Sequence, residues 1–246
     1  MSTMLRVKSV SKRFGGLVVL RSVSFQVDEG AIVGLIGPNG SGKTTMFNII
    51  TGFLRPDAGD VEFRGRSVVG LAPFKIAHMG IARTFQLVRP FTGLTTTENV
   101  AAAILYGRGA GSVREAQKEA CNWLRYVGLE DAIDKSVGTL TLAGKKRLEL
   151  ARALATGPRL LLLDEVFGGL NPTESESAMA LVRRIRDELR ITVLLVEHVM
   201  RVVMGLCDRV IVLDAGQVIA QGSAAAIQAD PQVRRIYLGE EYGAAC

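Results

Sequence analysis

The sequence has few of the residues that mark secreted, metal-binding or nucleic-acid-binding proteins. Its 246 residues include two histidines and three cysteines, and the cysteines (Cys121, Cys207 and Cys246) form no CxxC pair. This spacing argues against a disulfide framework and a Cys/His zinc site, and it predicts reduced, structural thiols. Aromatic residues make up only 6% of the chain. Basic patches interleaved with aromatics are therefore missing, and we expect no nucleic-acid partner.

Long apolar runs are also missing, although 48% of the residues are apolar. No stretch approaches the roughly 18 uncharged apolar residues of a membrane-spanning helix. Met1–Val10 lacks the apolar centre of a signal peptide. We therefore expect a cytoplasmic protein. The net charge of +6 is moderate, and basic groups such as Lys145–Arg147 are smaller than the roughly 4–8 clustered residues that bind lipid headgroups.

The strongest motif is a glycine-rich stretch between an apolar run and a helical segment. It fits G-x-x-x-x-G-K-[ST], the P-loop that wraps the phosphates of a nucleotide. Ala31–Ile36 precedes it as a short strand, and Thr45–Ile50 continues as a helix. Lys43 is expected to reach the β- and γ-phosphates, and Thr44 to ligate magnesium. The candidate phosphate-binding residues are Gly37, Pro38, Asn39, Gly40, Ser41, Gly42, Lys43, Thr44 and Thr45.

The hydrophobic pattern predicts a single α/β domain over 1–246. Leu5–Val10 and Val18–Val27 alternate apolar and polar residues, as half-buried strands do. We expect residues 1–87 and 159–246 to form a sheet core with a β subdomain, about 88–158 to form a helical subdomain, and about 223–246 to form a helical tail. In the helical part, Ser112 and Glu115 form a capping box. The helix behind it presents one apolar face, with Trp123 expected in the core: Ala116, Ala120, Trp123, Leu124 and Val127.

Two later apolar strands end in polar residues. Leu160–Leu163 leads into Asp164 and Glu165, and Ile191–Val196 is followed closely by His198. In parallel sheets, ligand-binding groups lie at such carboxyl ends. We expect Asp164 to hold magnesium, Glu165 to activate the attacking water, and His198 to donate a hydrogen bond to the γ-phosphate. Adjacent acids also occur in solvated turns, and a single histidine is often only a satisfied polar group. The P-loop upstream favours the functional interpretation.

Together these motifs resemble the ATP-binding subunits of ABC transporters over essentially the whole chain. The resemblance implies that Phe14 stacks on adenine and that Gln86 contacts magnesium and water and senses the membrane subunit. From the residues alone, Phe14 is more often a core residue and Gln86 is unremarkable. The implied fold is a P-loop NTPase of the ABC ATPase type. It has a mixed or parallel sheet core, an antiparallel β subdomain and a helical subdomain.

The signature region departs from the L-S-G-G-Q pattern of that family. Leu140–Gly144 stands in its place, so both glycines and the glutamine are replaced. Val166 and Asn171 likewise differ from the proline and aspartate that are commonest there. Backbone N–H donors survive any change of side chain, so the region keeps three candidate nucleotide contacts: Thr141, Ala143 and Gly144.

A narrower resemblance is to the ATPases of branched-chain amino acid importers. It is carried by Gly80–Gln86, Gly169–Pro172, Ala229–Pro231 and Tyr237–Glu240. It implies ATP and Mg²⁺ as cofactors and ATP-driven closure of a dimer with a second ABC ATPase subunit, either a homodimer or, as we favour, a heterodimer. The further partners implied are integral membrane permease subunits and, indirectly, a solute-binding protein, so the chain would lie at the inner face of the cell membrane.

Three alternatives to that assignment stay open. The first is an importer for another small solute, such as urea or an amide, and the second is a lipopolysaccharide-type exporter. The third is a soluble ATPase of the DNA-repair type, which would need a long coiled-coil insertion between the P-loop and the signature. Thr45–Leu140 has no sustained heptads, which disfavours this alternative.

Overall fold

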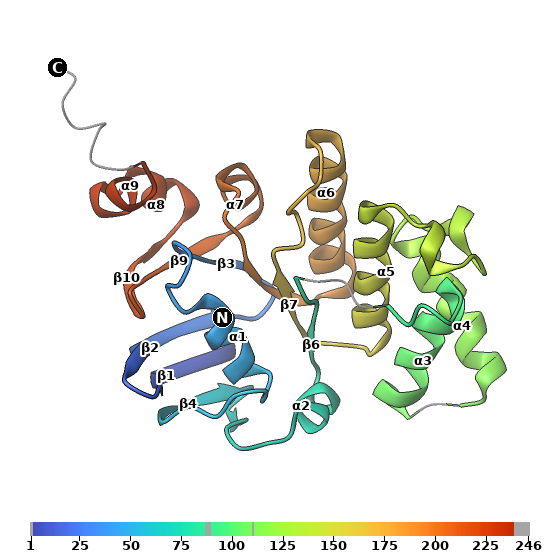
Figure 1. Ribbon diagram of the computed structural model, residues 1–246, viewed down its shortest axis with the longest axis horizontal. Helices are drawn as coiled ribbons and strands as arrows, with labels where there is room; N and C mark the ends of the chain where they lie inside the picture. Colours follow the sequence, from blue (N-terminus) through green and yellow to red (C-terminus); the bar gives the residue numbers. More distant parts are fainter. Residues whose placement is uncertain (1, 87–89, 110, 239–246) are drawn as a thin grey trace. The chain divides into compact units, whose positions relative to one another are not determined.

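The computed structural model describes residues 2–86, 90–109 and 111–238. Contacts between Cα atoms divide the chain into two compact units, Met1–Leu71 with Thr192–Cys246, and Ala72–Ile191. The chain runs from the first unit through the second and back, as the colours of Figure 1 show. Cys246 and the Gly239 and Glu240 positions of the predicted importer-type ending lie outside the described residues.

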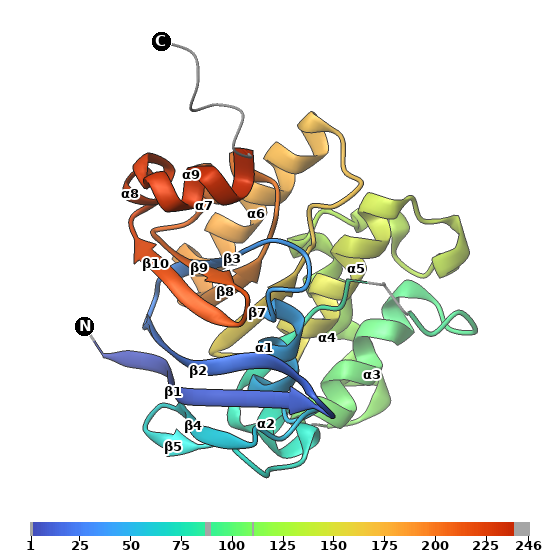
Figure 2. The ribbon, with the colours of Figure 1, turned by 60° about the vertical axis from the view of Figure 1, so that its left-hand side comes forward.

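The first unit contains an antiparallel sheet in the order β2-β1-β4-β5. Its strands are β1 (Thr3–Phe14), β2 (Leu17–Asp28), β4 (Ala58–Phe63) and β5 (Arg66–Ser67) (Figure 2). The predicted alternation is present, because Leu5 and Val7 are buried and pair with Val27 and Phe25. The strands extend beyond the predicted stretches, since backbone pairing continues where the side chains are polar.

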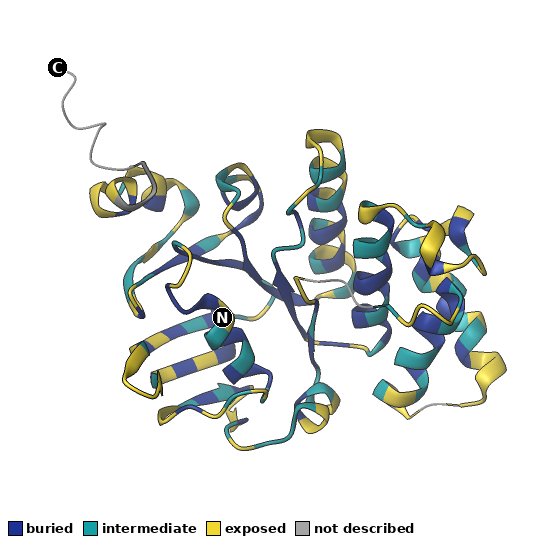
Figure 3. Ribbon diagram, viewed as in Figure 1, coloured by how far each residue is buried: buried dark blue, intermediate teal, exposed yellow. Residues whose placement is uncertain are grey.

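The parallel strands of the first unit are buried on both faces. They are β3 (Ile32–Ile36) and β8 (Thr192–Val196), which are buried at every residue (Figure 3), and β9 (Arg209–Asp214). β3 pairs in parallel with both β8 and β9. β10 (Gln217–Gly222) pairs antiparallel with β9 through a two-residue turn in which Ala215 and Gly216 both have positive φ. The sequence Asp214-Ala215-Gly216 between two apolar runs predicts a hairpin, and the structure confirms it.

The described residues of this unit form four helices: α1 (Lys43–Ile50), α7 (Met200–Leu206), α8 (Ala224–Ala229) and α9 (Pro231–Leu238). Pro231 predicts the start of the last helix, because the fixed φ of proline suits a first helical position, and α9 begins there. The sequence places Ser223 directly before a short alanine-rich stretch as a helix cap, and the structure confirms it: the Ser223 hydroxyl accepts a hydrogen bond from the Ala226 N–H at the start of α8.

The second unit joins a parallel pair of strands to a set of helices. β6 (Ile81–Arg83) pairs with β7 (Leu160–Asp164). The helices are α2 (Pro73–Met79), α3 (Thr96–Arg108), α4 (Val113–Tyr126), α5 (Leu142–Ala155) and α6 (Pro172–Leu189), with two 3₁₀ turns at Glu130–Ala132 and Val137–Thr139. α3 packs against α4 and α5. This unit is larger than the helical subdomain expected over about 88–158, and the predicted domain bounds stay a prediction.

One predicted helix cap of this unit is confirmed, but the predicted position of one aromatic side chain is wrong. The capping box of Ser112 and Glu115 is confirmed. The expectation that Trp123 lies in the core is wrong, because its side chain is half-exposed. The indole lies at the edge of the buried stripe, packs edge-on against Tyr126 with ring centroids 5.9 Å apart, and donates its N–H to Glu119. The polar N–H needs an acceptor, and an acceptor is available at the surface.

Within residues 2–86, 90–109 and 111–238, no helix combines the length and the hydrophobicity that a membrane span requires.

Candidate functional site

The P-loop joins β3 to α1, and its glycines are required by the backbone path. A Cβ on Gly37 would lie 2.0 Å from the carbonyl oxygen of Leu213, so no larger residue fits there. Gly42 has φ 106° and precedes the first turn of α1, which has no side-chain cap and no acidic residue. The first N–H groups of that helix are therefore open to an anion.

Side chains of the loop add further donors. The Lys43 side chain is buried, with 6% of the residue exposed, and its Nζ donates to the carbonyl oxygens of Gly37 and Pro38 at 2.8 and 2.9 Å. Ser41 Oγ is also buried and has no hydrogen-bond partner among the described residues. Thr44 is exposed at the start of α1. A buried hydroxyl normally finds a partner, so the geometry suits an anion with several acceptor oxygens.

The first unit also contains the predicted His198 and Phe14. Leu35 of β3 pairs with Val196 of β8 in parallel, so the P-loop and His198 follow the carboxyl ends of neighbouring strands. The His198 side chain is exposed. Phe14 is 46% exposed at the end of β1, with Lys12 Nζ 5.6 Å from its ring centroid. Phe14 is therefore not a core residue, and its ring is available for stacking.

The second unit contains the predicted acids, with a basic partner that the sequence analysis did not single out. Arg83 ends β6, and its Nη2 lies 2.6 Å from Asp164 Oδ2 at the end of β7. Both side chains are almost fully buried, at 6% and 5% exposure. The Asp164 N–H also donates to Thr84 Oγ1. Loss of one member of such a buried pair leaves an uncompensated charge. The available sequence signal was an arginine at the end of a short apolar strand.

The structure brings Gln86 and Glu165 together. Gln86 Nε2 donates to Glu165 Oε2 at 2.7 Å. Glu165 has φ 49°, in the left-handed region, which is uncommon for a residue with a side chain and is found at functional sites. The carboxylate is half-buried. The amide and the carboxylate therefore form one polar group directly after β7.

The signature region forms the first turn of α5. Thr141 is its N-cap, and its Oγ1 accepts a hydrogen bond from the Gly144 N–H at 3.1 Å. Ala143 is half-exposed, and the first turn contains no acidic residue. Backbone N–H groups at the start of the helix therefore remain available to an anion, even though the glycines of the family pattern are absent.

Helix α5 carries a buried carboxylate that the sequence analysis missed. Glu149 is 8% exposed, and its Oε1 accepts a hydrogen bond from the Phe85 N–H at 2.8 Å. Burial raises the pKa of Glu149 to about 7, while the Phe85 bond and the positive charges of Arg152 and Lys146 lower it. An acidic residue inside an otherwise basic and apolar helix was the signal that could have found it.

The oxygen donors expected to hold magnesium fit that ion chemically. They are a hydroxyl (Thr44), an amide (Gln86) and a carboxylate (Asp164), which are the hard ligands that Mg²⁺ prefers. Thr44 belongs to the first unit and the other two belong to the second.

Comparison with known proteins identifies the family. The model described as ABC transporter matches residues 20–168, and one described as Branched-chain amino acid ATP-binding cassette transporter matches residues 217–243. The high-affinity branched-chain amino acid transport ATP-binding protein BraF of Pseudomonas aeruginosa is 41% identical over 96% of this chain and 98% of its own. The lipopolysaccharide export system ATP-binding protein LptB of Acidithiobacillus ferridurans is 36% identical over 98% and 99%.

A solved structure agrees with both the family and the fold. The crystal structure of the ADP conformation of MJ1267, an ATP-binding cassette of an ABC transporter, matches with a TM-score of 0.87 and 32% identity, covering 98% of this chain and 100% of that one. The predicted fold class and the predicted family resemblance are confirmed. This chain belongs to the ABC transporter family and is one of its ATP-binding cassettes.

Proposed function

We propose that this chain is the ATP-hydrolysing subunit that energises an ABC importer for branched-chain amino acids. The observation that most directly supports an ATP-hydrolysing role is the 2.7 Å hydrogen bond between Gln86 Nε2 and Glu165 Oε2 at the end of β7. For the solute, support comes from the family model over residues 217–243 and from the identity to BraF, 41% against 36% for LptB. The ATPase subunit does not touch the solute, so the assignment of the solute rests on sequence similarity.

The nucleotide is held by groups of the first unit. The backbone N–H groups of the P-loop, Lys43 and the start of α1 bind the phosphates, and Phe14 stacks on adenine. Thr44, Gln86 and Asp164 are the residues that would hold magnesium, which would neutralise part of the negative charge of the phosphates when bound.

Hydrolysis depends on groups that orient and deprotonate water. Glu165 accepts a proton from the attacking water, and Gln86 keeps the carboxylate oriented through its amide. His198 donates a hydrogen bond to the γ-phosphate, where negative charge is concentrated. A second ATPase subunit covers the nucleotide with its own Thr141, Ala143 and Gly144. ATP drives closure of this dimer because it binds the closed form better than the open one.

The dimer acts on integral membrane permease subunits at the inner face of the cell membrane. We favour a heterodimer of two different ATPases in the working complex, with a solute-binding protein delivering the amino acid from outside. Importers for urea or amides, or a lipopolysaccharide-type exporter, are the competing assignments.

Nucleotide binding is tested with Lys43→Ala and a matched control, Lys118→Met, at an exposed lysine on α4. Isothermal titration with ATP should show a loss of affinity of at least tenfold in Lys43→Ala only, because a charge-assisted contact to phosphate is removed. Parental affinity in Lys43→Ala would contradict the P-loop assignment.

The solute is tested by purifying the chain with its permeases and solute-binding protein and reconstituting them in vesicles. ATP-dependent uptake of leucine, with urea and acetamide as controls, supports the proposal. Uptake of urea or acetamide alone, or ATP-dependent extraction of lipopolysaccharide, overturns the assignment of solute and leaves the ATPase assignment in place.

A further inference from the structure

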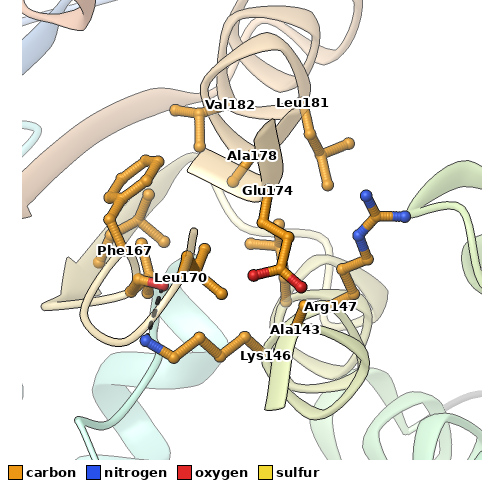
Figure 4. A pocket seen from close by; sticks show the side chains of 12 residues that line it. Ala143, Lys146, Arg147, Phe167, Leu170, Glu174, Ala178, Leu181 and Val182 are labelled. Carbon is orange, nitrogen blue, oxygen red and sulfur yellow. Dashed lines mark hydrogen bonds between the residues drawn. The ribbon is translucent and has the colours of Figure 1, made fainter. Parts of the chain in front are cut away.

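Lys146 on helix α5 forms hydrogen bonds to the loop after β7, which carries Glu165. Lys146 Nζ donates to the carbonyl oxygens of Glu165, Val166 and Gly168, at 3.3, 2.9 and 2.5 Å. An ammonium group has three N–H donors, and here three backbone carbonyls of one loop receive them. Figure 4 shows the extended lysine side chain with its nitrogen at this loop. The lysine therefore acts as a local brace for the loop backbone.

Apolar packing around the same loop is incomplete. A pocket of about 40 Å³ lies between the loop, α5 and α6, and Val166, Phe167, Leu170 and Val182 are among the residues that line it (Figure 4). Unfilled space offers no dispersion contacts to its lining. Glu165 also has the strained φ of 49°. The polar contacts to Lys146 therefore add to the backbone hydrogen bond from the Gly168 N–H to the Glu165 carbonyl oxygen in holding this conformation.

The same helix holds the segment that carries Gln86. Glu149 lies three residues after Lys146, on the same face of α5, and accepts the Phe85 N–H at 2.8 Å. Phe85 directly precedes Gln86, whose amide donates to Glu165. One helix thus contacts the backbone on both sides of the Gln86–Glu165 hydrogen bond, through one positive and one negative side chain.

We propose that Lys146 and Glu149 are positioning residues that hold the Glu165 loop and the Gln86 segment on helix α5, so that the amide and the carboxylate meet. The inference rests on the proposed function, in which Gln86 and Glu165 act on ATP. Neither residue touches nucleotide or water in this assignment, and both act through the backbone.

The test compares steady-state ATP hydrolysis and ATP affinity in purified variants of the full chain. Lys146→Met keeps the aliphatic stem and removes the ammonium, and Glu149→Met removes the acceptor. Each should lower kcat at least tenfold while KM for ATP stays within threefold of the parent, because the phosphate-binding groups are unchanged. Lys146→Arg and Glu149→Gln keep a donor and an acceptor and should recover part of the lost rate. Lys118→Met, on the exposed face of α4, is the control.

A double variant separates positioning from a general loss of structure. In a Glu165→Gln background, Lys146→Met should cause no further loss of the residual rate, because its effect passes through the Glu165 side chain. A further tenfold loss there overturns the proposal, as does a parental kcat in folded Lys146→Met. If the circular dichroism spectrum of Lys146→Met differs from that of the parent, the variant has not folded correctly. Lys146→Gln, which keeps an amide donor, is then measured in its place and judged by the same criteria.

The outcomes distinguish this inference from the proposed function. If Glu165→Gln hydrolyses ATP at the parental rate, the function assigned to the site fails, and the positioning roles fail with it. If Glu165→Gln is inactive but Lys146→Met and Glu149→Met both keep the parental kcat, only the positioning roles fail.

Discussion

Substitution of Glu149 by glutamine should change how the stability of the protein depends on pH. Burial raises the pKa of this carboxyl from its usual 4.5 to about 7 in the folded protein. Below pH 4.5 the group is protonated in both folded and unfolded chains, so its contribution to stability is fully present there. As the pH rises from 4.5 to 7, the unfolded chain loses the proton first, and the free energy of unfolding falls.

The expected size follows from the shift in pKa. A shift of 2.5 pK units corresponds to about 3 kcal/mol at 1.36 kcal/mol per unit, of which roughly 2–3 kcal/mol is lost between pH 5 and pH 8.5. Glu149→Gln keeps an acceptor for the Phe85 N–H but has no proton to lose. The free energy of unfolding of the variant relative to the parent should therefore rise by that amount over this range.

The assay is denaturant unfolding of both proteins at several pH values, with Glu130→Gln, at an exposed position, as the control for the chemistry of the substitution. Using the difference between variant and parent removes the effects of other titrating groups that the two proteins share. A difference that stays constant from pH 5 to pH 8.5 would refute the argument that burial controls this carboxyl.

Three further outcomes are expected. Glu165→Gln should bind ATP and remain as an ATP-bound dimer in size-exclusion chromatography, because only the group that deprotonates water is lost; undiminished hydrolysis would contradict this role. Arg83→Leu should lower the free energy of unfolding by about 3–5 kcal/mol, because it leaves Asp164 as an unpaired buried charge. The double variant Arg83→Leu/Asp164→Leu should recover part of this lost stability. A double variant no more stable than Arg83→Leu alone would contradict a stabilising role for the Arg83–Asp164 ion pair. Burial raises the pKa of the Cys207 thiol to about 12. A thiol reagent at pH 8, followed by mass spectrometry, should therefore modify Cys207 only after the protein unfolds. Rapid labelling of Cys207 in the folded protein would contradict its burial.

The features that sequence predicted well are those encoded by neighbouring residues. The P-loop follows an apolar strand and precedes a helix, and the cap at Ser112 is signalled by Glu115 three residues later. The same is true of the hairpin at Asp214–Gly216, where two residues with positive φ join two apolar strands. In each case the physical cause lies within a few residues of the pattern.

The features that were missed depend on contacts between distant parts of the chain. Arg83 and Asp164 are 81 residues apart, and Phe85 and Glu149 are 64 apart. No local pattern states which charged side chain will be buried, or which partner will meet it. The prediction for Trp123 was wrong for a related reason. Helical spacing identifies one face of a helix but does not show how much of that face other elements cover. The assignments of Gln86, His198 and the signature residues to steps of hydrolysis stay predictions.

The ammonium of Lys43 already has two acceptors in its own loop, the carbonyl oxygens of Gly37 and Pro38. In the proposed role of Lys43, nucleotide binding would therefore be an exchange of hydrogen-bond partners, in which phosphate oxygens replace these two carbonyl oxygens. The net gain is the difference between two sets of hydrogen bonds, so a smaller anion gains little. In the same proposed role, Lys43 can return to the carbonyl oxygens of Gly37 and Pro38 when the phosphates leave, so its ammonium group has acceptors both with and without nucleotide.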